Sequence, residues 1–402
     1  MILCLSSLAL TRANAQWTQT TSLPDGYAGQ ALGYWSGFLY QAGGGSNSKG
    51  ILDGNNVFYA QVHSNGTLGT WNVATPLPEA TMYHAGVVAN GFDYVLGGII
   101  LLPDYTIGIT NAVYYARINP DGNLGAWQTA NPLPHPLFFL SAATWNGRIY
   151  VAGGYDGTSY FNAVWSAQIQ TDGSLSPWVA QAPLPDAVFT QAEVANGMLY
   201  VLGGMVNGGT TIKNKAYYSR INADGTLAGW NQTTPLPQPL GSLCAVPAGG
   251  RIFVTGGDNG SRLVANFYSA AVAGDGSLAT WSSGPALPRA MYEFGMAVTD
   301  SYIFLAGGTD NIQDFSGVYS MPLLPPPTAP ALAAQSFGTN GAFQLQLTSS
   351  TNTGFGLQAS TNLADWTCIS WGFTDTNGLL FFQDTNAAQF PRRFYRAYWP
   401  LP

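Results

Sequence analysis

The chain has 402 residues, of which 46% are hydrophobic and only 8% are charged, against roughly 25% charged residues in a typical soluble domain. Thirteen basic and twenty acidic residues give a formal net charge of −7. This composition argues against binding to nucleic acid or to an anionic membrane, both of which need a basic surface. Because the protein carries few charged residues, little electrostatic repulsion opposes self-association. Such a surface suits a protein that binds a neutral polymer or its own copies.

Residues 1–15 are typical of a secretory signal peptide. An apolar stretch precedes Ala13 and Ala15, which form the small-residue pattern of a cleavage site before Gln16. The segment lacks a basic start, which leaves open a true start further upstream, and a buried N-terminal strand is the alternative interpretation. No run approaches the ~20 apolar residues of a membrane-spanning helix. We therefore expect a protein without a transmembrane segment that is secreted, extracellular or at the cell surface.

From residue 16 onward, one sequence phrase occurs six times, a tryptophan followed by five residues and then Leu-Pro. The tryptophans are Trp17, Trp71, Trp127, Trp178, Trp230 and Trp281. Between them recurs an apolar run that ends in a glycine pair, at 43–44, 97–98, 153–154, 203–204, 256–257 and 307–308. A spacing of about 50 residues is the signature of a repeat architecture.

The unit that begins at Trp127 predicts four short antiparallel strands. The first covers residues 137–144, and the second covers 148–152 and ends at the glycine pair. The third covers 163–169, and an Asp-Gly turn joins it to a fourth strand that carries Trp178. Four such strands per repeat form the blade of a β-propeller.

The two ends of the repeat array complement each other. After the sixth glycine pair a third strand is recognisable at Tyr319, but position 332 carries no tryptophan. Trp17 and its Leu-Pro stand at the other end without a preceding strand. We therefore expect one blade to be completed by the N-terminal strand, which closes the ring and removes the exposed edges of an open array.

These phrases resemble the kelch family of propellers, the fold of the galactose oxidase central domain. Kelch blades combine four apolar residues and Gly-Gly, a spaced aromatic residue, and a tryptophan followed by Leu-Pro or Met-Pro. The resemblance covers residues 16–324 and implies an all-β, six-bladed β-propeller over residues 16–322. The interval from the aromatic residue to the tryptophan is longer than is usual in kelch blades, so the resemblance does not extend to a subfamily.

A proline-rich linker at residues 323–331 separates the propeller from a C-terminal module at residues 332–402. Five alternating strands are predicted in the module, at 342–348, 355–360, 366–370, 379–383 and 393–398. The phrases that end at Trp366 and Arg396 resemble a small β-sandwich found at the C-termini of secreted bacterial proteins. That resemblance implies a domain that anchors, docks or binds glycan, and a stabilising cap on the propeller is the alternative.

Few of the catalytic and metal-binding side chains of enzymes with a similar propeller fold are present in this chain. Copper oxidases of this fold need two histidines, two tyrosines and a tyrosine-linked cysteine, whereas the histidines here are His63, His84 and His135 and the propeller cysteine is Cys244. Six-bladed sialic-acid epimerases act on an anionic substrate, which requires converging basic residues. This chain has only 13 lysines and arginines. No catalytic Ser-His-Asp set or phosphate-binding loop is visible. We predict no cofactor and no metal site.

A ligand pocket is expected at the mouth of the central channel, lined by the innermost strand of each blade. Aligning the repeats on Leu-Pro gives two adjacent columns, the first with Tyr83 and Glu293 and the second with Gln30, His84 and Gln191. Because side chains alternate along a strand, only one column is expected to face the channel. Glu293 is the candidate acid or base if the protein is an enzyme. The alternatives are a hydrogen-bonded structural carboxylate and, for His84, a satisfied core histidine.

The loops after the glycine pairs form a second candidate surface, since loops on a rigid scaffold often carry function. Tyr155, like Tyr105 and Tyr160, is a candidate for stacking on a sugar ring. Asp156 and Asp258 are candidates for binding sugar hydroxyls or Ca²⁺, although aspartate is also a common turn former, which is the favoured interpretation.

The sequence favours a secreted, non-enzymatic protein whose propeller recognises an extracellular glycan or protein. The low charge motivates one alternative, an extracellular structural subunit that self-assembles. The other alternative is a sugar-acting enzyme, epimerase-like or oxidase-like, with its site at the channel mouth.

Overall fold

The computed structural model of the chain describes residues 16–46, 51, 54–186, 189–206, 211–323, 331–337, 342–349, 354–363, 366–375 and 377–398. Within these residues the regular structure is β-strand, apart from 3-10 conformation at Ile51 and a short 3-10 helix at Ala387–Gln389. The predicted signal peptide and most of the predicted linker lie outside the described residues. No described helix is long and apolar enough to cross a membrane.

Six sheets between residues 16 and 323 share one order of strands, from an inner strand to an outer one. The first three are β3(Ala31–Trp35)-β4(Phe38–Ala42)-β6(Val57–Gln61)-β7(Asn72–Val73), β9(Ala85–Ala89)-β10(Phe92–Leu96)-β13(Val113–Arg117)-β14(Gln128–Thr129) and β15(Ser141–Trp145)-β16(Arg148–Ala152)-β17(Val164–Gln168)-β18(Val179–Ala180). The others are β19(Phe189–Ala195)-β20(Met198–Val206)-β22(Ala216–Arg220)-β23(Asn231–Gln232), β24(Cys244–Ala248)-β25(Arg251–Thr255)-β26(Phe267–Ala271)-β27(Ser282–Ser283) and β28(Gly295–Val298)-β29(Tyr302–Ala306)-β30(Val318–Pro322)-β1(Thr18–Gln19).

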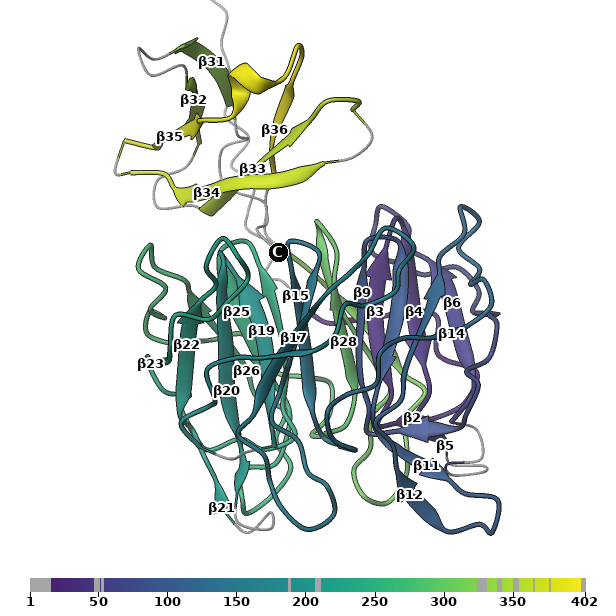
Figure 1. Ribbon diagram of the computed structural model, residues 1–402. Coiled ribbons are helices and arrows are strands. Elements are labelled where there is room, and N and C mark those ends of the chain that lie inside the picture. The colour runs from purple at the N-terminus through teal and green to yellow at the C-terminus, as the bar shows by residue number, and fades with distance from the viewer. Residues whose placement is uncertain are drawn as a thin grey trace, which may run out of the picture.

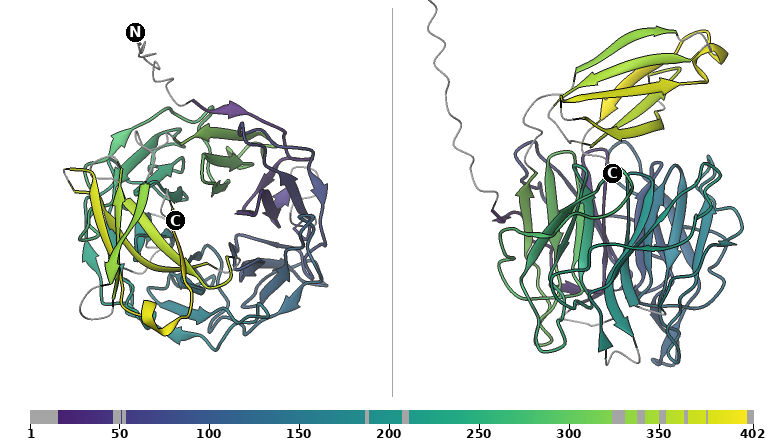
Figure 2. Two further views of the ribbon diagram at one scale, coloured as in Figure 1. Left: turned by 90° about the horizontal axis from the view of Figure 1, so that it is seen from above. Right: turned by 90° about the vertical axis from the view of Figure 1, so that its left-hand side faces the viewer.

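The six sheets stand around a central axis, as the left view of Figure 2 shows. Each inner strand contacts the inner strand of the next sheet, in the order β3, β9, β15, β19, β24 and β28, and β28 contacts β3. The sheet that ends the array receives its outer strand from the N-terminal side, since Thr18 pairs with Ser320 and Gln19 with Tyr319.

Short extra strands mark one face of the ring, which we call the loop face because the loops after the glycine pairs lie there (Figure 1). They are β2(Tyr27–Ala28), β5(Gly45–Ser46), β8(Thr81–Met82), β11(Ile99–Leu101), β12(Ile107–Ile109) and β21(Thr211–Ile212). The opposite face carries the tight turns that join each inner strand to the second strand, and we call it the hairpin face.

Every repeat tryptophan ties its sheet to the neighbouring one. Its indole N–H donates to the backbone carbonyl that lies two residues before the leucine of the preceding Leu-Pro phrase, as for Trp71 and Thr21 at 3.0 Å. The other pairs are Trp127–Thr75 at 2.9 Å, Trp178–Asn131 at 3.0 Å, Trp230–Ala182 at 2.9 Å and Trp281–Thr234 at 3.2 Å. Trp17 follows the same rule with the last phrase, donating to Pro285 at 3.2 Å.

Buried tyrosines make a second contact between sheets that the sequence analysis did not predict. Each lies three residues before a glycine pair and donates its hydroxyl hydrogen to the carbonyl of the turn glycine in the next sheet. The pairs are Tyr40–Gly122 at 2.9 Å, Tyr94–Gly173 at 2.7 Å, Tyr150–Gly225 at 2.9 Å and Tyr200–Gly276 at 2.6 Å. The four Asp-Gly turns therefore serve as hydrogen-bond acceptors as well as hairpin turns.

The third repeat shows where the predicted strands differ from the observed ones. Its first strand begins at Ser141 rather than at residue 137, because Phe139 has a φ of 54° and interrupts the extended backbone. Asn146 and Gly147 then turn the chain with φ values of 47° and 70°, as a two-residue hairpin of type I′ requires. The fourth strand is only two residues long, Val179–Ala180.

The C-terminal residues form two three-stranded sheets around a separate core. One sheet is β31(Ala331–Phe337)-β32(Phe343–Thr348)-β35(Leu379–Asp384), and the other is β34(Thr367–Phe373)-β33(Gly354–Ser360)-β36(Phe394–Tyr398). Leu345, Leu347, Phe355, Leu357 and Phe382 are buried between them. The sequence analysis missed β31, because its first residue was assigned to the linker.

This C-terminal module lies over the hairpin face, where β34 meets the turns of the propeller sheets (Figure 1). The indole nitrogen of Trp371 lies 3.1 Å from where a Cβ atom on Gly197 would stand, and the ring of Phe373 lies 3.6 Å from that position on Gly250. Both side chains pack against the hydrophobic clusters of the fourth and fifth sheets. The loop face is on the other side of the ring and stays clear of the module.

Replacing Tyr200 with phenylalanine is expected to lower the free energy of unfolding by about 1–3 kcal/mol, because the buried Gly276 carbonyl loses its donor. Urea denaturation followed by fluorescence measures the change. Tyr105→Phe is the control, since Tyr105 is 78% exposed and should leave the midpoint unchanged. Equal midpoints for Tyr200→Phe and the wild type would contradict the bonding role.

Candidate functional site

Three adjoining cavities follow the axis of the ring inward from the loop face. The mouth cavity has a volume of about 410 Å³ and is lined by residues that include Tyr83, Tyr292 and Glu293. The neck, of about 120 Å³, shares Tyr83 and Glu293 with the mouth. The inner chamber, also about 120 Å³, shares Gln30 and His84 with the neck. The channel is therefore open to ligands from the loop face.

Residues of both aligned columns line the neck, so the expectation that only one column faces the channel was wrong. The first column contributes Gly29, Tyr83, Phe139, Ser242 and Glu293, and the second contributes Gln30, His84, Leu140, Gln191, Leu243 and Phe294. The first-column residues have positive φ values, among them 56° at Tyr83 and 57° at Glu293. Strand alternation holds only for extended backbone, and these residues precede the inner strands in the left-handed region.

Backbone hydrogen bonds between sheets hold the first column in this conformation. Tyr83 donates its N–H to the Gly29 carbonyl at 2.8 Å, and Gly29 donates to the Glu293 carbonyl at 2.9 Å. Phe139 donates in the same way to Tyr83 at 2.9 Å. A left-handed residue other than glycine costs of order 1–2 kcal/mol, and these bonds between neighbours offset that cost.

The glycine pairs make room for the side chains of the second column. A Cβ atom on Gly307 would stand 2.3 Å from the Gln30 amide nitrogen, and one on Gly43 would stand 2.5 Å from the His84 ring. Close approach is thus the reason for glycine at these positions. At the position where the third repeat has Leu140, the first two repeats have the polar residues Gln30 and His84.

Tyr83 and Glu293 form a hydrogen-bonded pair at the border between mouth and neck. They come from sheets that flank the β3 sheet, and Gly29 at the equivalent position of that sheet lies beneath the Tyr83 ring. A Cβ atom on Gly29 would stand 2.7 Å from this ring. Glycine at position 29 therefore gives Tyr83 the space to reach Glu293, and Phe139 supports the ring at a centroid distance of 4.6 Å.

Burial raises the pKa of Glu293 to about 7, and the nearby Asp314 carboxylate adds to the rise. The hydrogen bond from the Tyr83 hydroxyl acts in the opposite direction, because it stabilises the ionised carboxylate. Burial and the Glu293 carboxylate raise the pKa of Tyr83, so its hydroxyl stays a neutral donor. Near neutral pH, Glu293 can thus either give or accept a proton.

A second carboxylate in the channel, Glu193, was missed by the sequence analysis. It lies on β19 two residues beyond Gln191 and so on the same strand face, and the Gln191 amide donates to its Oε1 at 2.9 Å. Burial raises the pKa of Glu193 to about 8. Only the two columns next to the Leu-Pro phrase were compared, and a glutamate two positions further into the inner strand was the available signal.

Cys244 lies beside this carboxylate and lines both the neck and the inner chamber. Its thiol donates to the Phe294 carbonyl at 2.8 Å, and no disulfide joins Cys244 to Cys368. Burial raises the pKa of Cys244, and the charge of Glu193 raises it further. The thiol therefore stays protonated and is a poor nucleophile.

His84 and Gln30 are each only 7% exposed and carry buried polar atoms without a partner. Burial lowers the pKa of His84 to about 4, and the backbone of Ala42 opposes this only weakly, since neither ring nitrogen makes a well-formed hydrogen bond. The Gln30 Nε2 donates to the Ala306 carbonyl at 2.9 Å, whereas its Oε1 has no donor. His84 is thus a neutral channel residue rather than a satisfied core histidine.

Tyr155 belongs to an aromatic ladder that runs from the loops to the channel mouth. Its ring stacks on Tyr160 at 4.6 Å and meets Phe138 edge-on at 5.4 Å. Phe138 in turn contacts Phe139, the residue that supports Tyr83. Tyr105 stands apart on the exposed tip between β11 and β12.

Asp156 and Asp258 are engaged in turns. The Asp156 carboxylate accepts the backbone N–H groups of Thr158 at 2.8 Å and Ser159 at 2.6 Å, and the backbone donors lower its pKa. Asp258 accepts the N–H of Gly260 at 2.8 Å. The described residues contain no group of three His, Cys, Asp or Glu side chains placed to hold a metal ion.

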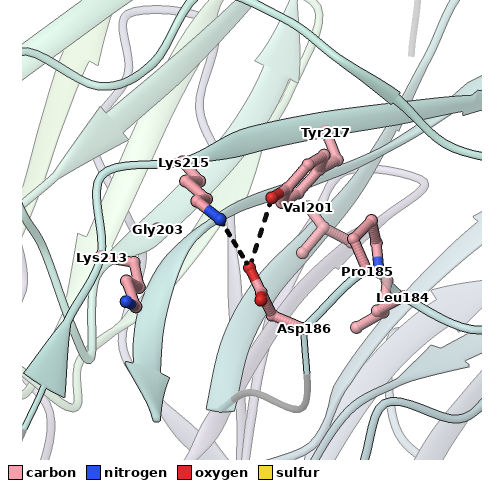
Figure 3. A pocket seen from close by; sticks show the side chains of 8 residues that line it. All are labelled: Leu184, Pro185, Asp186, Val201, Gly203, Lys213, Lys215 and Tyr217. Atoms are coloured by element: carbon pink, nitrogen blue, oxygen red, sulfur yellow. Dashed lines mark hydrogen bonds and ion pairs between the residues drawn. The ribbon is translucent and has the colours of Figure 1, made fainter.

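A small cleft on the loop side of the fourth sheet gathers two lysines (Figure 3). The Asp186 carboxylate there accepts hydrogen bonds from the Lys215 ammonium and from the Tyr217 hydroxyl, each at 3.3 Å. The cleft holds only about 10 Å³, which is no more than the space of one water molecule. It offers no ligand site comparable to the channel mouth.

Comparison with known proteins supports a kelch-type β-propeller. Residues 136–166 match the kelch motif. The chain is 28% identical over 195 residues to the human protein "Kelch repeat and BTB domain-containing protein 12", covering 45% of this chain and 30% of that protein. It is 26% identical over 286 residues to "Kelch-like protein terF" of Aspergillus terreus, covering 64% of this chain and 59% of that protein.

The chain thus spans less than two thirds of the length of these curated relatives. Among solved structures, that titled "Structure of YjhT" superposes with a TM-score of 0.60 at 12% sequence identity, covering 80% of this chain and 98% of that one. At this identity the likeness shows the fold alone.

Replacing Glu293 with glutamine is expected to stabilise the protein at about pH 8 relative to the wild type, and less so at about pH 5. The folded-state pKa of about 7 lies above the ordinary value of 4.5, so the stability contributed by the protonated carboxyl is complete below the ordinary value. It is lost as the pH rises through the folded value. Melting temperatures at the two pH values and a carboxyl NMR titration test this, and parallel pH dependences in both proteins would contradict it.

Proposed function

We propose that the protein is a secreted, non-enzymatic binding protein whose propeller recognises an extracellular glycan at the mouth of its channel. We infer that the six repeat sheets form a closed six-bladed ring in which β1 is the closing strand. The C-terminal module is proposed to be a β-sandwich that attaches the propeller to its surroundings. Its position on the hairpin face supports this division of labour, because the mouth stays accessible on the loop face.

The mouth cavity is the observation that carries the proposal. Its volume of about 410 Å³ lies in the range of roughly 300–1,000 Å³ that small-molecule sites occupy. Its lining combines the rings of Tyr83 and Tyr292 with the hydrogen-bonding side chains of Asn311, Gln313 and Glu293. Apolar ring faces beside hydrogen-bonding groups match a sugar, whose C–H face stacks on aromatic rings and whose hydroxyls need polar partners.

The charge of the mouth narrows the class of glycan. None of the described residues that line it is a lysine or an arginine, whereas Glu293 and Asp314 are acidic. Anionic sugars would meet repulsion here and would lack the basic partners that carboxylate recognition requires. The mouth is therefore suited to a neutral or cationic glycan.

Preorganisation of the mouth supports binding as its function. The Tyr83 ring is held between Gly29 and Phe139, and its hydroxyl is oriented by Glu293. The hydroxyl of Tyr292 donates to Asn311 on the facing loop. Side chains fixed before binding lose little conformational entropy on complex formation.

Replacing Tyr83 or Tyr292 with alanine is expected to weaken glycan binding by about tenfold or more, which corresponds to about 1.4 kcal/mol. A glycan array identifies the ligand, and titration calorimetry measures the affinities. Tyr105→Ala is the matched control, because that exposed tyrosine lies outside the mouth. Binding that depends on Tyr105 and not on the mouth tyrosines, or binding confined to a protein ligand, would argue against the proposal.

One observation favours a second candidate function, a sugar-acting enzyme. The pKa of Glu293 near 7 is well matched to general acid–base catalysis at neutral pH. If the protein converts a sugar, the conversion is expected to be lost in Glu293→Gln and kept in Glu79→Gln, whose carboxylate lies outside the cavity. NMR of sugars incubated with each protein gives the answer. A wild type that is active together with an equally active Glu293→Gln would remove Glu293 from the chemistry.

A further inference from the structure

We propose that the neck of the channel recognises a primary ammonium group, so that the glycan bound at the mouth carries an amino sugar with a free amine. The sugar ring would occupy the mouth cavity between Tyr83 and Tyr292, with its ammonium group directed into the neck toward Glu293 and Gln30. This inference rests on the glycan-binding function proposed above and names the substituent that the site selects.

The charges along the channel are of one sign. Among the described residues that line the mouth, the neck and the inner chamber, none is a lysine or an arginine. Glu293 and Asp314 line the mouth, and Glu193 lies further inward beside Gln191. His84 is the only basic side chain of the lining, and its lowered pKa of about 4 keeps it neutral at physiological pH. A cationic group therefore meets attraction and no repulsion along this path.

Four side-chain donors of the channel are used within the protein. The Tyr83 hydroxyl bonds Glu293, the Tyr292 hydroxyl donates to Asn311, and the Gln191 and Gln30 amides donate to Glu193 and to the Ala306 carbonyl. The Glu293 carboxylate and the Gln30 Oε1 are acceptors that these bonds do not use up. An ammonium group has three donors and no acceptor, so it is the complementary group.

Gln30 supplies an observation that is independent of the acidic side chains. Its amide orientation is set by the bond to Ala306, which leaves Oε1 as a buried acceptor without a donor. The Gln30 side chain lines the same neck of about 120 Å³ as Glu293. An unsatisfied buried acceptor costs about 1–3 kcal/mol, which a donor from the ligand would recover. An N-acetyl group is uncharged and offers a single N–H donor, so it would give the Glu293 carboxylate no opposite charge.

The electrostatics of Glu293 suit a cationic ligand. Burial and the neighbouring Asp314 both disfavour the ionised form of Glu293, as its raised pKa records. An ammonium group at this position would stabilise the carboxylate by opposite charge and lower its pKa. An ammonium group would therefore offset part of the cost of burying the Glu293 carboxylate.

The test compares three oligosaccharides of equal length that differ at one substituent, with glucosamine, N-acetylglucosamine or glucose as the unit. Calorimetric titration of the full chain is expected to show about tenfold tighter binding of the glucosamine oligomer, or about 1.4 kcal/mol. The preference should weaken with added salt, because it is electrostatic. A lysine peptide serves as a fourth ligand that carries the ammonium group without a sugar.

Two variants test the assigned partners. Glu293→Gln and Gln30→Leu are expected to reduce the preference for the free amine to about threefold or less, while weak binding of the glucose oligomer remains. Leucine at position 30 copies Leu140 and Leu243, which the chain already carries at the equivalent positions. Glu79→Gln is the control carboxylate outside the channel and should keep the full preference.

The outcomes separate this inference from the function on which it rests. Equal binding of the three oligomers, or a preference that survives Glu293→Gln, would overturn ammonium recognition and leave glycan binding intact. No binding of any oligomer would overturn both. Binding of the lysine peptide alone would overturn the amino-sugar assignment and identify a protein ligand.

Discussion

The hydrogen bond from each repeat tryptophan to the Leu-Pro segment of the neighbouring sheet is the interaction on which the rest of the structure depends. A four-stranded sheet of this size cannot bury both of its faces by itself, and it is stable only when it is packed between two others. The indole provides a large apolar surface and a single donor, so the same side chain both packs and fixes the register between sheets. Trp17 makes the same bond to Pro285 that Trp71 makes to Thr21. The sheet that contains β1 is therefore joined to its neighbour by the same kind of hydrogen bond as the other sheets.

The geometry of the channel follows from this packing. Sheets held side by side bring their inner strands close enough for backbone groups at the strand starts to bond one another, as Tyr83 does with Gly29. Those bonds hold the residues before each inner strand in the left-handed region. Side chains that would have pointed away from the channel in an extended strand are thereby turned into its mouth. Tyr83 and Glu293 meet for this reason.

Much of the propeller could be predicted from the sequence, because its determinants are local. The Asn-Gly and Asp-Gly turns, the alternating strands and the glycine pairs each act within a few residues, and the observed sheets follow their order. The tyrosine bonds between sheets were not predicted, since a tyrosine such as Tyr200 looks like any other core residue. Glu193 was missed because only the two columns next to the Leu-Pro phrase were compared, whereas its position beside Cys244 is a relation between different sheets that the sequence does not show.

The sequence by itself determined the repeat, the strand order within each unit and the composition of the two columns at the inner strands. Only the tertiary structure decided that both columns line one channel and that Gly29 leaves the space through which Tyr83 reaches Glu293. It also decided which polar atoms of Gln30 and His84 stay without a partner. The physical reason is that φ at the strand starts, the burial of a carboxylate and the satisfaction of a buried amide depend on neighbouring sheets. Local sequence does not specify those contacts.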